Sequence, residues 1–229
     1  MALAPGWLDR LPTDRLLAEI SLWSADLLRL GDDIARFEPF TDLFHIDVAD
    51  GHFSPALLLF PDQIAAIRQA TAKPLHVHLM VDDAILLAQV EQFAKAGADV
   101  ISVHAENANA ATAIGHIAGL GCIPGVVLQL ETPVDACRPF LDRIGILTLL
   151  GTETGIKGAG LDSRAGPRLE EARQMLQETG HRVLLAADGG IREHTVPLLR
   201  KAGAETIVMG SLAFGAPNLP ARMAWVHAQ

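Results

Sequence analysis

Cysteine is scarce in this chain of 229 residues. Its two cysteines, Cys122 and Cys137, stand far apart and have no CxxC spacing. This scarcity excludes a disulfide-rich scaffold and a zinc ribbon, and it is typical of proteins that work in a reducing cytosol. We therefore expect a cytoplasmic protein.

Long apolar runs and basic clusters are lacking as well. The opening MALAPGWLDRLPTDRLLAEI carries charges throughout, so it indicates neither a signal peptide nor a membrane span. The chain has 18 Lys and Arg against 27 Asp and Glu, a net charge of -9, with no basic run. We expect no membrane partner and no nucleic-acid partner. An anionic substrate would need a local cradle that works against the overall field.

Two nucleotide-binding motifs are also missing. No GxGxxG follows the first apolar segment, and no GxxxxGK[ST] occurs anywhere. A doubly wound open sheet would share the β-α alternation described next, and these absences count against it.

Short apolar segments alternate with amphipathic ones along the whole chain. Six of the latter have clear helical spacing: FPDQIAAIRQA, AILLAQVEQFAKAGA, ATAIGHIAGLG, PVDACRPFLDRI, PRLEEARQMLQETG and HTVPLLRKAGA. Eight strands in strict alternation with helices predict an α/β fold, a (β/α)8 TIM barrel. The predicted strands are 19–24, 43–49, 75–80, 99–105, 123–130, 145–150, 182–188 and 206–210.

No proline- or serine-rich linker divides the sequence, so we expect a single domain. Residues 1–17 are predicted to be a short lead-in helix or cap, residues 18–215 the barrel, and residues 216–229 a final helix. AGAD (96–99) and AGAE (202–205) are paired helix exits, each with a glycine that closes the helix.

Ionisable residues gather near the ends of three predicted strands. Alternate residues of a strand share a face, and the apolar partners Phe44 and Ile46 are expected to face the helices. The opposite set, His45, Asp47, His78 and Asp188, should then face the barrel axis near the C-terminal ends of its strands. TIM barrels build their active sites at this end.

A set of two histidines and two carboxylates suits zinc, iron, manganese or cobalt better than calcium or magnesium. The alternative is a buried hydrogen-bonded network without metal, which we would prefer for any one of these residues alone. For the four together we favour one divalent ion per subunit. His76 lies one layer deeper and is interpreted as a supporting or packing residue. Asp50 is expected to cap the turn before Gly51, and His52 is left undecided.

Three glycine-bearing turns follow late strands: GTETGIKGAG (151–160), DGG (188–190) and GS (210–211). Glycine lets backbone N–H groups approach an anion, and the loops after the last strands form the usual phosphate cradle of this fold. Ser211 adds a hydroxyl and Lys157 a positive charge. The coincidence of these turns favours a phosphorylated substrate, although each glycine alone would be an ordinary turn.

At these residues the sequence resembles the ribulose-phosphate 3-epimerase family. ISLWSADLLRLGDDI is similar to its opening strand and helix, HIDVADGHFSP to its HxDxMDGxFVP motif, and HVHLM to its DxHLM motif. ADGGI and GSLAFG are similar to its closing DGG and GSAxF phosphate turns. The resemblance runs from about residue 18 to 215.

The resemblance implies a metal-dependent ketose-phosphate 3-epimerase, an isomerase with D-ribulose 5-phosphate as the default substrate and D-xylulose 5-phosphate as the product. No organic cofactor is expected. Asp47 and Asp188 would be the acid–base pair on either side of an enediolate, because inverting a carbon next to a ketone needs a proton removed from one face and returned to the other. Metal ligands would be His45, Asp47, His78 and Asp188. Substrate contacts are predicted for Ser21, His78, Met80, Gly155, Ile156, Lys157, Gly158, Gly189, Gly190, Gly210 and Ser211.

The sequence departs from the family pattern in several places. Ala49 and Leu150 stand where methionines are usual, and His76 replaces the DxHLM aspartate. In the sixth loop, Glu153 and Thr154 replace Asn-Pro, and Lys157 replaces a glycine. A different ketose phosphate, such as D-allulose 6-phosphate or a tetrulose phosphate, is therefore an alternative substrate. The other interpretation of the loop is drift that leaves its backbone contacts unchanged.

The sequence disfavours two other classes of protein. A Schiff-base aldolase needs a lysine at a strand's end, and none of the chain's lysines takes such a place: Lys73, Lys95, Lys157 and Lys201. A non-catalytic sugar-phosphate sensor is disfavoured by the intact acid–base pair. The apolar barrel helices lead us to expect a homo-oligomer.

Overall fold

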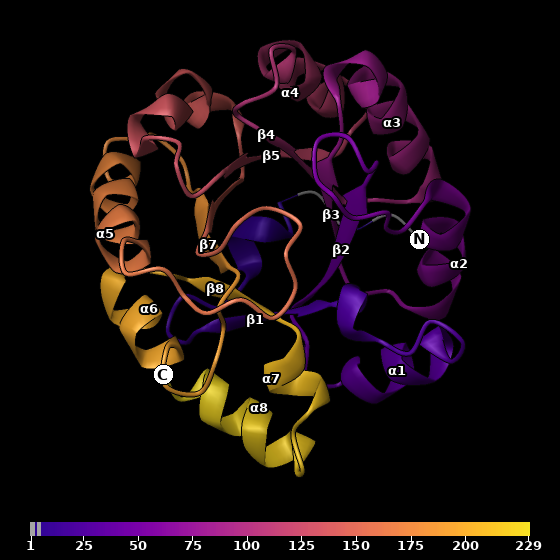
Figure 1. Ribbon diagram of the computed structural model, residues 1–229, viewed down its shortest axis with the longest axis vertical. Helices are drawn as coiled ribbons and strands as arrows, with labels where there is room; N and C mark the ends of the chain where they lie inside the picture. The colour runs from indigo at the N-terminus through magenta and orange to yellow at the C-terminus, as the bar shows by residue number, and fades with distance from the viewer. Residues whose placement is uncertain (1–2, 4–5) are drawn as a thin grey trace.

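Eight parallel strands pair in chain order and close into a barrel in the computed structural model, which describes residue 3 and residues 6–229 (Figure 1). The first and last strands pair directly, with Leu17 opposite Thr206. This closure confirms the predicted TIM barrel and excludes an open, doubly wound sheet. The strands are β1 (Leu17–Ser21), β2 (Leu43–Ala49), β3 (Leu75–Met80), β4 (Val100–His104), β5 (Ile123–Leu128), β6 (Ile146–Leu150), β7 (Leu184–Asp188) and β8 (Thr206–Met209).

Helices surround the barrel and cover the outer faces of its strands (Figure 1). None of those in the described part of the chain is long and apolar enough to cross a membrane. They are α1 (Leu30–Phe37), α2 (Pro61–Ala70), α3 (Asp83–Ala96), α4 (Ala110–Gly119), α5 (Ala165–Leu176), α6 (Val196–Ala202), α7 (Ser211–Phe214) and α8 (Leu219–His227), with the 3-10 helices η1 (Leu8–Arg10), η2 (Leu22–Ser24) and η3 (Val134–Arg143).

Two predicted elements differ most from the structure, and several other strands end one or two residues from their predicted bounds. The first strand begins at Leu17 rather than residue 19, and it ends at Ser21, where η2 begins. The segment LLAEISLWS (16–24) is mostly apolar on both sides of each boundary, so its pattern did not mark where the strand begins or ends. Residues 133–144 were expected to form a helix of the ordinary kind, but η3 is a 3-10 helix. Pro139 lies inside it and has no N–H for an α-helical hydrogen bond.

The alternation along β2 separates two environments. Phe44, Ile46 and Val48 are buried among side chains of the surrounding helices, in the main apolar core. His45 and Asp47 point to the barrel interior, where the register sets them opposite His76 and His78 of β3. The predicted assignment of faces is therefore confirmed. Parallel pairing alone brings the ionisable residues of neighbouring strands level with one another.

The predicted glycine exits also occur. Gly97 ends α3 with a φ of 105°, and its N–H donates to the carbonyl of Ala94. A β-carbon there would lie only 2.8 Å from the Arg68 side chain. Both the left-handed backbone and the close contact require glycine.

At the end of the barrel opposite the active-site loops, Asp42 joins three parts of the chain. Its carboxylate accepts hydrogen bonds from Arg15 at 2.6 and 2.9 Å and from the backbone N–H of Ala18 at 2.9 Å. His227 of α8 lies 3.6 Å away. Burial would raise the pKa of Asp42, but these partners outweigh it and lower the pKa to about 2.

Replacing Asp42 with Asn should destabilise the fold by about 1–3 kcal/mol, because hydrogen bonds to a charged group are lost from a mostly buried site. The folded-state pKa lies below the unfolded value of about 3.9. The contribution is therefore complete above pH 4 and is lost as the pH falls towards 2. Urea unfolding of both proteins between pH 2 and 7 would measure this. Asp135→Asn, which removes an exposed pair with Arg138, should have almost no effect. A pH-independent difference for Asp42→Asn would contradict the assignment.

Candidate active site

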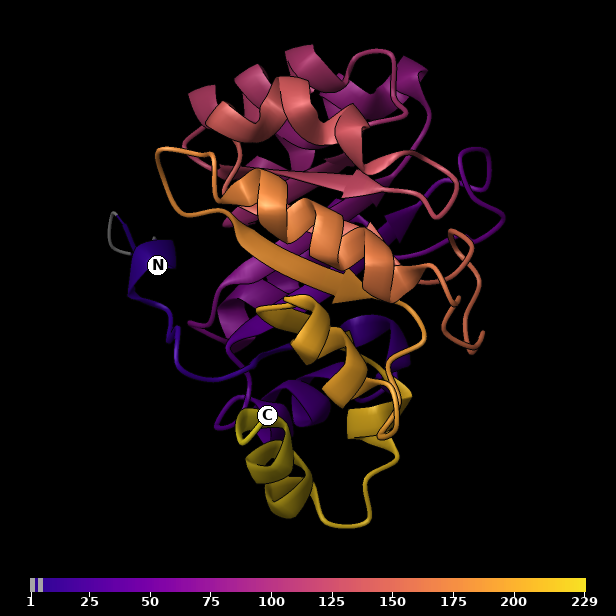
Figure 2. The same ribbon diagram turned by 90° about the vertical axis from the view of Figure 1, so that its left-hand side faces the viewer.

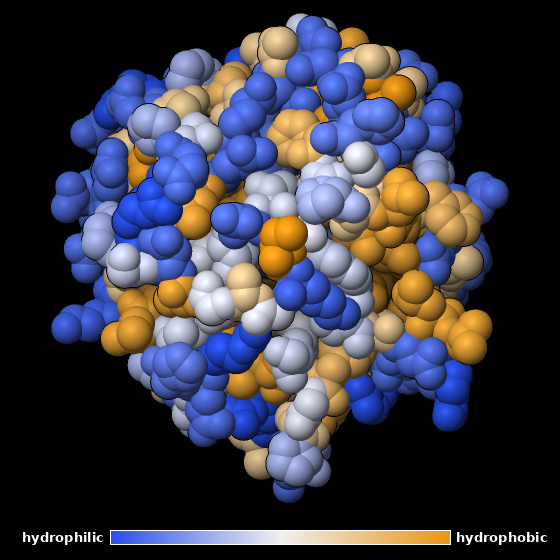
Figure 3. All heavy atoms as spheres, in the orientation of Figure 1, coloured by the Kyte–Doolittle hydropathy of each residue, from blue (hydrophilic) through white to orange (hydrophobic). Residues whose placement is uncertain are grey.

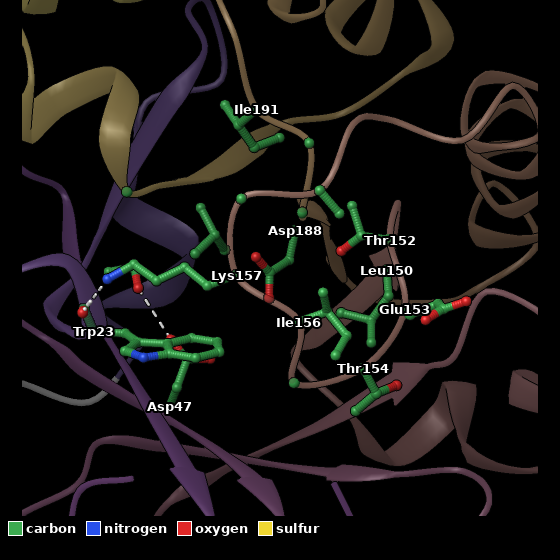
Figure 4. A pocket seen from close by; sticks show the side chains of 18 of the residues that line it. Trp23, Asp47, Leu150, Thr152, Glu153, Thr154, Ile156, Lys157, Asp188 and Ile191 are labelled. Carbon is green, nitrogen blue, oxygen red and sulfur yellow. Dashed lines mark hydrogen bonds between the residues drawn. The ribbon is translucent and has the colours of Figure 1, made fainter. Parts of the chain in front are cut away.

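A pocket opens at the C-terminal ends of the strands, and every substrate-contacting and catalytic residue predicted from the sequence lines it. Asp47 and Asp188 lie on its floor (Figure 4), and His78 lines the pocket with them. The glycine-bearing turns after β6, β7 and β8 also line it. His45 lies below this floor and is fully buried. One site therefore brings together all the predicted residues.

Four of these side chains converge on one point. One donor atom each from His45, Asp47, His78 and Asp188 lies within 4.8 Å of all the others. The Asp47 carboxylate lies 3.3 Å from Nε2 of His45 and 3.4 Å from Nδ1 of His78. Asp188 is 3.9 Å from each of these nitrogens. Donors about 2.1 Å from one tetrahedral ion stand about 3.4 Å apart, so the spacing fits a metal such as zinc.

The two histidine nitrogens that face this point are buried and have no hydrogen-bond partner: Nε2 of His45 and Nδ1 of His78. Buried polar atoms are normally paired. Burial lowers the pKa of His78 to about 4, so its ring is neutral near pH 7. Burial would also lower the pKa of His45, but Asp47 and Glu19 raise it well above its usual range. His45 must therefore lose a proton before it can ligate a metal.

Glu19 was not predicted from the sequence as a site residue. It is fully buried on β1 beneath the pocket, where Oε2 accepts hydrogen bonds from Nδ1 of His45 at 3.1 Å and Nδ1 of His76 at 2.8 Å. Oε1 accepts from the Thr206 hydroxyl. Burial opposes its charge, but His76 and His45 hold the pKa of Glu19 below its usual range. A glutamate two residues before Ser21, on the same strand face, was the available signal.

His76 acts as expected for a supporting residue. Its Nδ1 contacts Glu19, and its Nε2 lies 2.7 Å from the Ser102 hydroxyl. The ring also lies edge-on to His45, with 4.9 Å between centroids. It therefore supports the site without lining the pocket.

His104 and Glu106 were also missed. His104 is buried at the end of β4, with Nε2 2.9 Å from Nε2 of His78 and Nδ1 3.1 Å from Oε2 of Glu106. Burial lowers the pKa of His104. The pKa of Glu106 is lowered because hydrogen bonds from His104 and Thr132 outweigh its burial. The alternation of Ser102 and His104 on one face of β4, with Glu106 two residues beyond the strand's end, could have revealed this set.

The two aspartates differ in their affinity for a proton. Burial would raise the pKa of Asp47, but His45 and His78 lower it well below its usual range. Burial raises the pKa of Asp188 to about 6 in spite of His45, and the charge of Asp47 adds to the rise. Two carboxylates on one site with different proton affinities are typical of acid–base pairs.

The glycine turns adopt backbone conformations that need glycine. Gly189 and Gly190 have φ values of 87° and 69°. A β-carbon on Gly190 would lie 2.6 Å from the backbone of Leu161. The turn after β8 places Gly210 and Ser211 on the same pocket wall. Arg192, which sequence reasoning missed, joins them and donates to the carbonyls of Ile191 and Gly158.

The sixth loop crosses the mouth of the barrel (Figure 1). Lys157 donates from Nζ to the carbonyl of Trp23 at 2.8 Å and stands 5.7 Å from the centroid of the Trp23 ring. Glu153, in contrast, points away from Lys157 (Figure 4). The loop is therefore fastened to the segment after β1 across the pocket.

Other predicted residues behave as follows. The Ser21 hydroxyl donates to Asp47 at 3.0 Å. Asp50 caps its turn, as expected, by accepting from the backbone N–H groups of His52 and Phe53. His52, which was undecided, is exposed and does not line the pocket.

Taken together, the barrel and this carboxylate–histidine site describe an enzyme of the TIM-barrel class. The Ribulose-phosphate 3 epimerase family matches residues 17–214, so the chain belongs to this family. The resemblance stated from the motifs is thereby confirmed, as is the placement among isomerases that act on carbohydrates.

Several similar proteins carry the name ribulose-phosphate 3-epimerase. The chain is 37% identical over 198 residues to ribulose-phosphate 3-epimerase of Bacillus subtilis strain 168, covering 85% of this chain and 90% of that protein. It is 37% identical to the ribulose-phosphate 3-epimerase of Synechocystis, covering 90% and 91%. The enzyme of that name from Escherichia coli K12 is 31% identical, covering 86% and 88%.

Solved structures share the fold at lower identity. A crystal structure of 3-hexulose-6-phosphate synthase superposes with a TM-score of 0.67 at 20% identity, covering 93% of this chain and 98% of that chain. KGPDC from Streptococcus mutans, in complex with D-R5P, gives 0.70 at 14% identity, covering 91% and 94%. These likenesses support the barrel fold alone.

Replacing Lys157 with Met should loosen the sixth loop, because it removes the hydrogen bond and the cation–π contact with Trp23. We expect backbone amides of residues 155–158 to exchange about 2- to 5-fold faster in deuterated water, as one exposed cation–π contact would give. Amides of the barrel strands should be unchanged. Lys95→Met is the matched control, because Lys95 is an exposed side chain on α3. Equal exchange in the two variants would show that Lys157 does not hold the loop.

Proposed function

We propose that the protein is a metal-dependent ketose-phosphate 3-epimerase that interconverts D-ribulose 5-phosphate and D-xylulose 5-phosphate. The observation that carries this proposal is the pair of buried, unpartnered nitrogens of His45 and His78, which face two carboxylates of unequal pKa. Family membership supplies the reaction class, and the relatives' names supply the substrate.

The proposed ligands of one divalent ion are His45, Asp47, His78 and Asp188. Nitrogen and carboxylate donors suit zinc, iron, manganese or cobalt. When bound, such an ion supplies positive charge that stabilises negative charge developing on the substrate oxygens. No step in this proposal needs an organic cofactor.

Asp47 and Asp188 are the proposed acid–base pair. One carboxylate removes the proton on C3 next to the ketone, which gives an enediolate, and the other returns a proton to the opposite face. In the metal-free protein, burial and the charge of Asp47 make Asp188 the more basic of the two carboxylates. Ser21 donates to Asp47 and so fixes the direction of its lone pairs.

The substrate's phosphate is proposed to lie against the three glycine turns. Gly189, Gly190, Gly210 and Ser211 offer backbone N–H groups and a hydroxyl on one side of the pocket. Gly155, Ile156, Lys157 and Gly158 close the other side, and Met80 contacts the sugar. Lys157 and Arg192 supply local positive charge in a chain whose net charge is -9.

The altered sixth loop supports a second candidate, the same chemistry on another ketose phosphate such as D-allulose 6-phosphate or a tetrulose phosphate. Lys157 and Glu153 line the pocket directly, so they are the residues that would set this preference. A sugar-phosphate sensor remains the non-catalytic alternative.

We also propose self-association. Large apolar side chains are exposed after β1 and β2, namely Leu27, Leu28, Leu57 and Phe60. Figure 3 shows apolar residues gathered on this side of the molecule, over α1 and α2. Analytical ultracentrifugation that found only monomer at micromolar concentration would contradict it.

Proton NMR in deuterated water tests the function. Metal-reconstituted protein should incorporate deuterium at C3 of D-ribulose 5-phosphate while D-xylulose 5-phosphate accumulates. Removing the metal with a chelator should abolish both signals, and adding Co²⁺ or Zn²⁺ should restore them. Exchange only with another ketose phosphate would keep the chemistry and change the substrate. No exchange with any ketose phosphate would favour the sensor.

The same assay tests the acid–base pair. Asp47→Asn and Asp188→Asn should each lower turnover by at least about 100-fold, the usual contribution of a positioned acid or base. Far-ultraviolet circular dichroism should show an intact barrel. Asp50→Asn, which changes the turn cap after β2 and a hydrogen bond from the backbone N–H of Asp82, lies outside the pocket; it is the control and should keep most activity. A fully active Asp47→Asn or Asp188→Asn variant would remove that residue from the proposed pair.

A further inference from the structure

Three side chains in contact lead away from the proposed metal site at the end of β4: His78 and His104 are buried, and Glu106 is partly buried. His78 contacts His104, His104 contacts Glu106, and Glu106 is anchored by the hydroxyl of Thr132 and the backbone N–H of Gln129. No step of the proposed reaction uses His104 or Glu106, and neither lines the pocket.

The donors and acceptors along this chain have only one consistent direction. Glu106 is an ionised carboxylate and can only accept, so Nδ1 of His104 must carry the hydrogen that it donates. Nε2 of neutral His104 is then an acceptor. It lies 2.9 Å from Nε2 of His78, which must therefore carry a hydrogen and donate it. Nδ1 of His78 is left as a bare lone pair.

We propose that His104 and Glu106 are positioning residues that hold His78 in the tautomer able to bind the metal. We call this chain of hydrogen bonds, from Glu106 through His104 to His78, the relay. It leaves Nδ1 of His78 without a hydrogen, and this is the buried atom without a partner that faces Asp47 at 3.4 Å. This inference rests on the proposed function, since it concerns the same metal site. His45 is served by Glu19 directly, whereas His78 depends on an intervening ring.

The opposite tautomer would place a hydrogen on Nδ1 of His78, between the ring and Asp47, where the metal is proposed to bind. It would also place two acceptors opposite each other, either between His78 and His104 or between His104 and Glu106. The relay thus fixes the tautomer of His78, because the carboxylate of Glu106 can only accept hydrogen bonds. Glu106 itself does not reach the pocket and acts through His104.

Glu106→Gln should reverse the relay. The backbone N–H of Gln129 can only donate, so the amide oxygen of the new side chain must face it, and the NH₂ group must face His104. Nδ1 of His104 then becomes the acceptor and Nε2 carries the hydrogen. To keep its hydrogen bond, His78 must move its own hydrogen to Nδ1. We expect the affinity for Co²⁺ to fall by about 10- to 100-fold, as for other outer partners of metal ligands.

The readout is the Kd for Co²⁺, measured by competition with a chelator, together with long-range ¹H–¹⁵N spectra of the histidine rings in the metal-free protein. Wild type should show His78 with hydrogen on Nε2, and Glu106→Gln should show it on Nδ1. Glu91→Gln is the matched control, because exposed Glu91 also faces a histidine, His116, far from the site. It should leave both readouts unchanged.

A double-mutant cycle separates the relay from simple loss of structure. His104→Phe keeps a ring of similar shape but offers no acceptor, so it should itself weaken Co²⁺ binding. In that background Glu106→Gln should cause no further loss, because the connection is already broken. An equal additional loss would show that Glu106 acts through the general structure, and the relay would be wrong.

The remaining outcomes are distinct. If wild type binds Co²⁺ and Glu106→Gln binds it equally well, the relay is overturned while the proposed function stands. If wild type binds no divalent ion, the proposed function is wrong and the relay falls with it. A 10- to 100-fold weaker Kd with the shifted His78 tautomer supports the proposal.

Discussion

The structure depends on one constraint, which is that ionisable groups buried under the barrel mouth must each have a partner. Glu19, His45, His76, His78 and His104 are all essentially inaccessible to water. An isolated charge at such depth would be very costly. Glu19 from β1 accepts from His45 and His76, and Glu106 from the turn after β4 accepts from His104. Among these histidines, the unpartnered nitrogens are Nε2 of His45 and Nδ1 of His78, which face the pocket. The histidine nitrogens that face away from the pocket are therefore hydrogen-bonded, whereas those that face it are free to bind a metal.

Closure of the barrel makes this arrangement possible. Register between β2 and β3 places His45 level with His76 and Asp47 level with His78, without any special loop. Asp188 arrives from β7 on the other side of the barrel axis. Figure 2 shows η1 and the first described residues at one end of the barrel, with the loop after β6 at the other. Ties such as Arg15–Asp42 thus stabilise one end, and the opposite end is left to the chemistry.

Much of this was visible in the sequence. Alternation along FHIDVA assigned His45 and Asp47 to the interior, and the same rule applied to LHVHLM found His78. Gly97 and Gly203 correctly marked the ends of two helices, because the chain turns there with a positive φ that favours glycine. Glu19 and the His104–Glu106 pair were missed because their function depends on contacts between strands, and a pattern within one strand does not show which ring a carboxylate will meet. Helical spacing over residues 133–144 predicted an ordinary helix, although Pro139, inside it, was the available signal for the 3-10 form.

The unequal support of the two histidines follows from these contacts. His45 donates directly to Glu19, and His76 and the Thr206 hydroxyl contact the same side chain, so three polar groups of the interior share one carboxylate. The family's DxHLM aspartate is absent here, and His76 occupies its place, facing a carboxylate that β1 provides. His76 needs such an acceptor when Nδ1 carries its hydrogen, and Glu19 needs donors to remain ionised at that depth. His76 and Glu19 are therefore the two sides of one buried hydrogen bond, and a change to either alone would remove one of the other's buried partners.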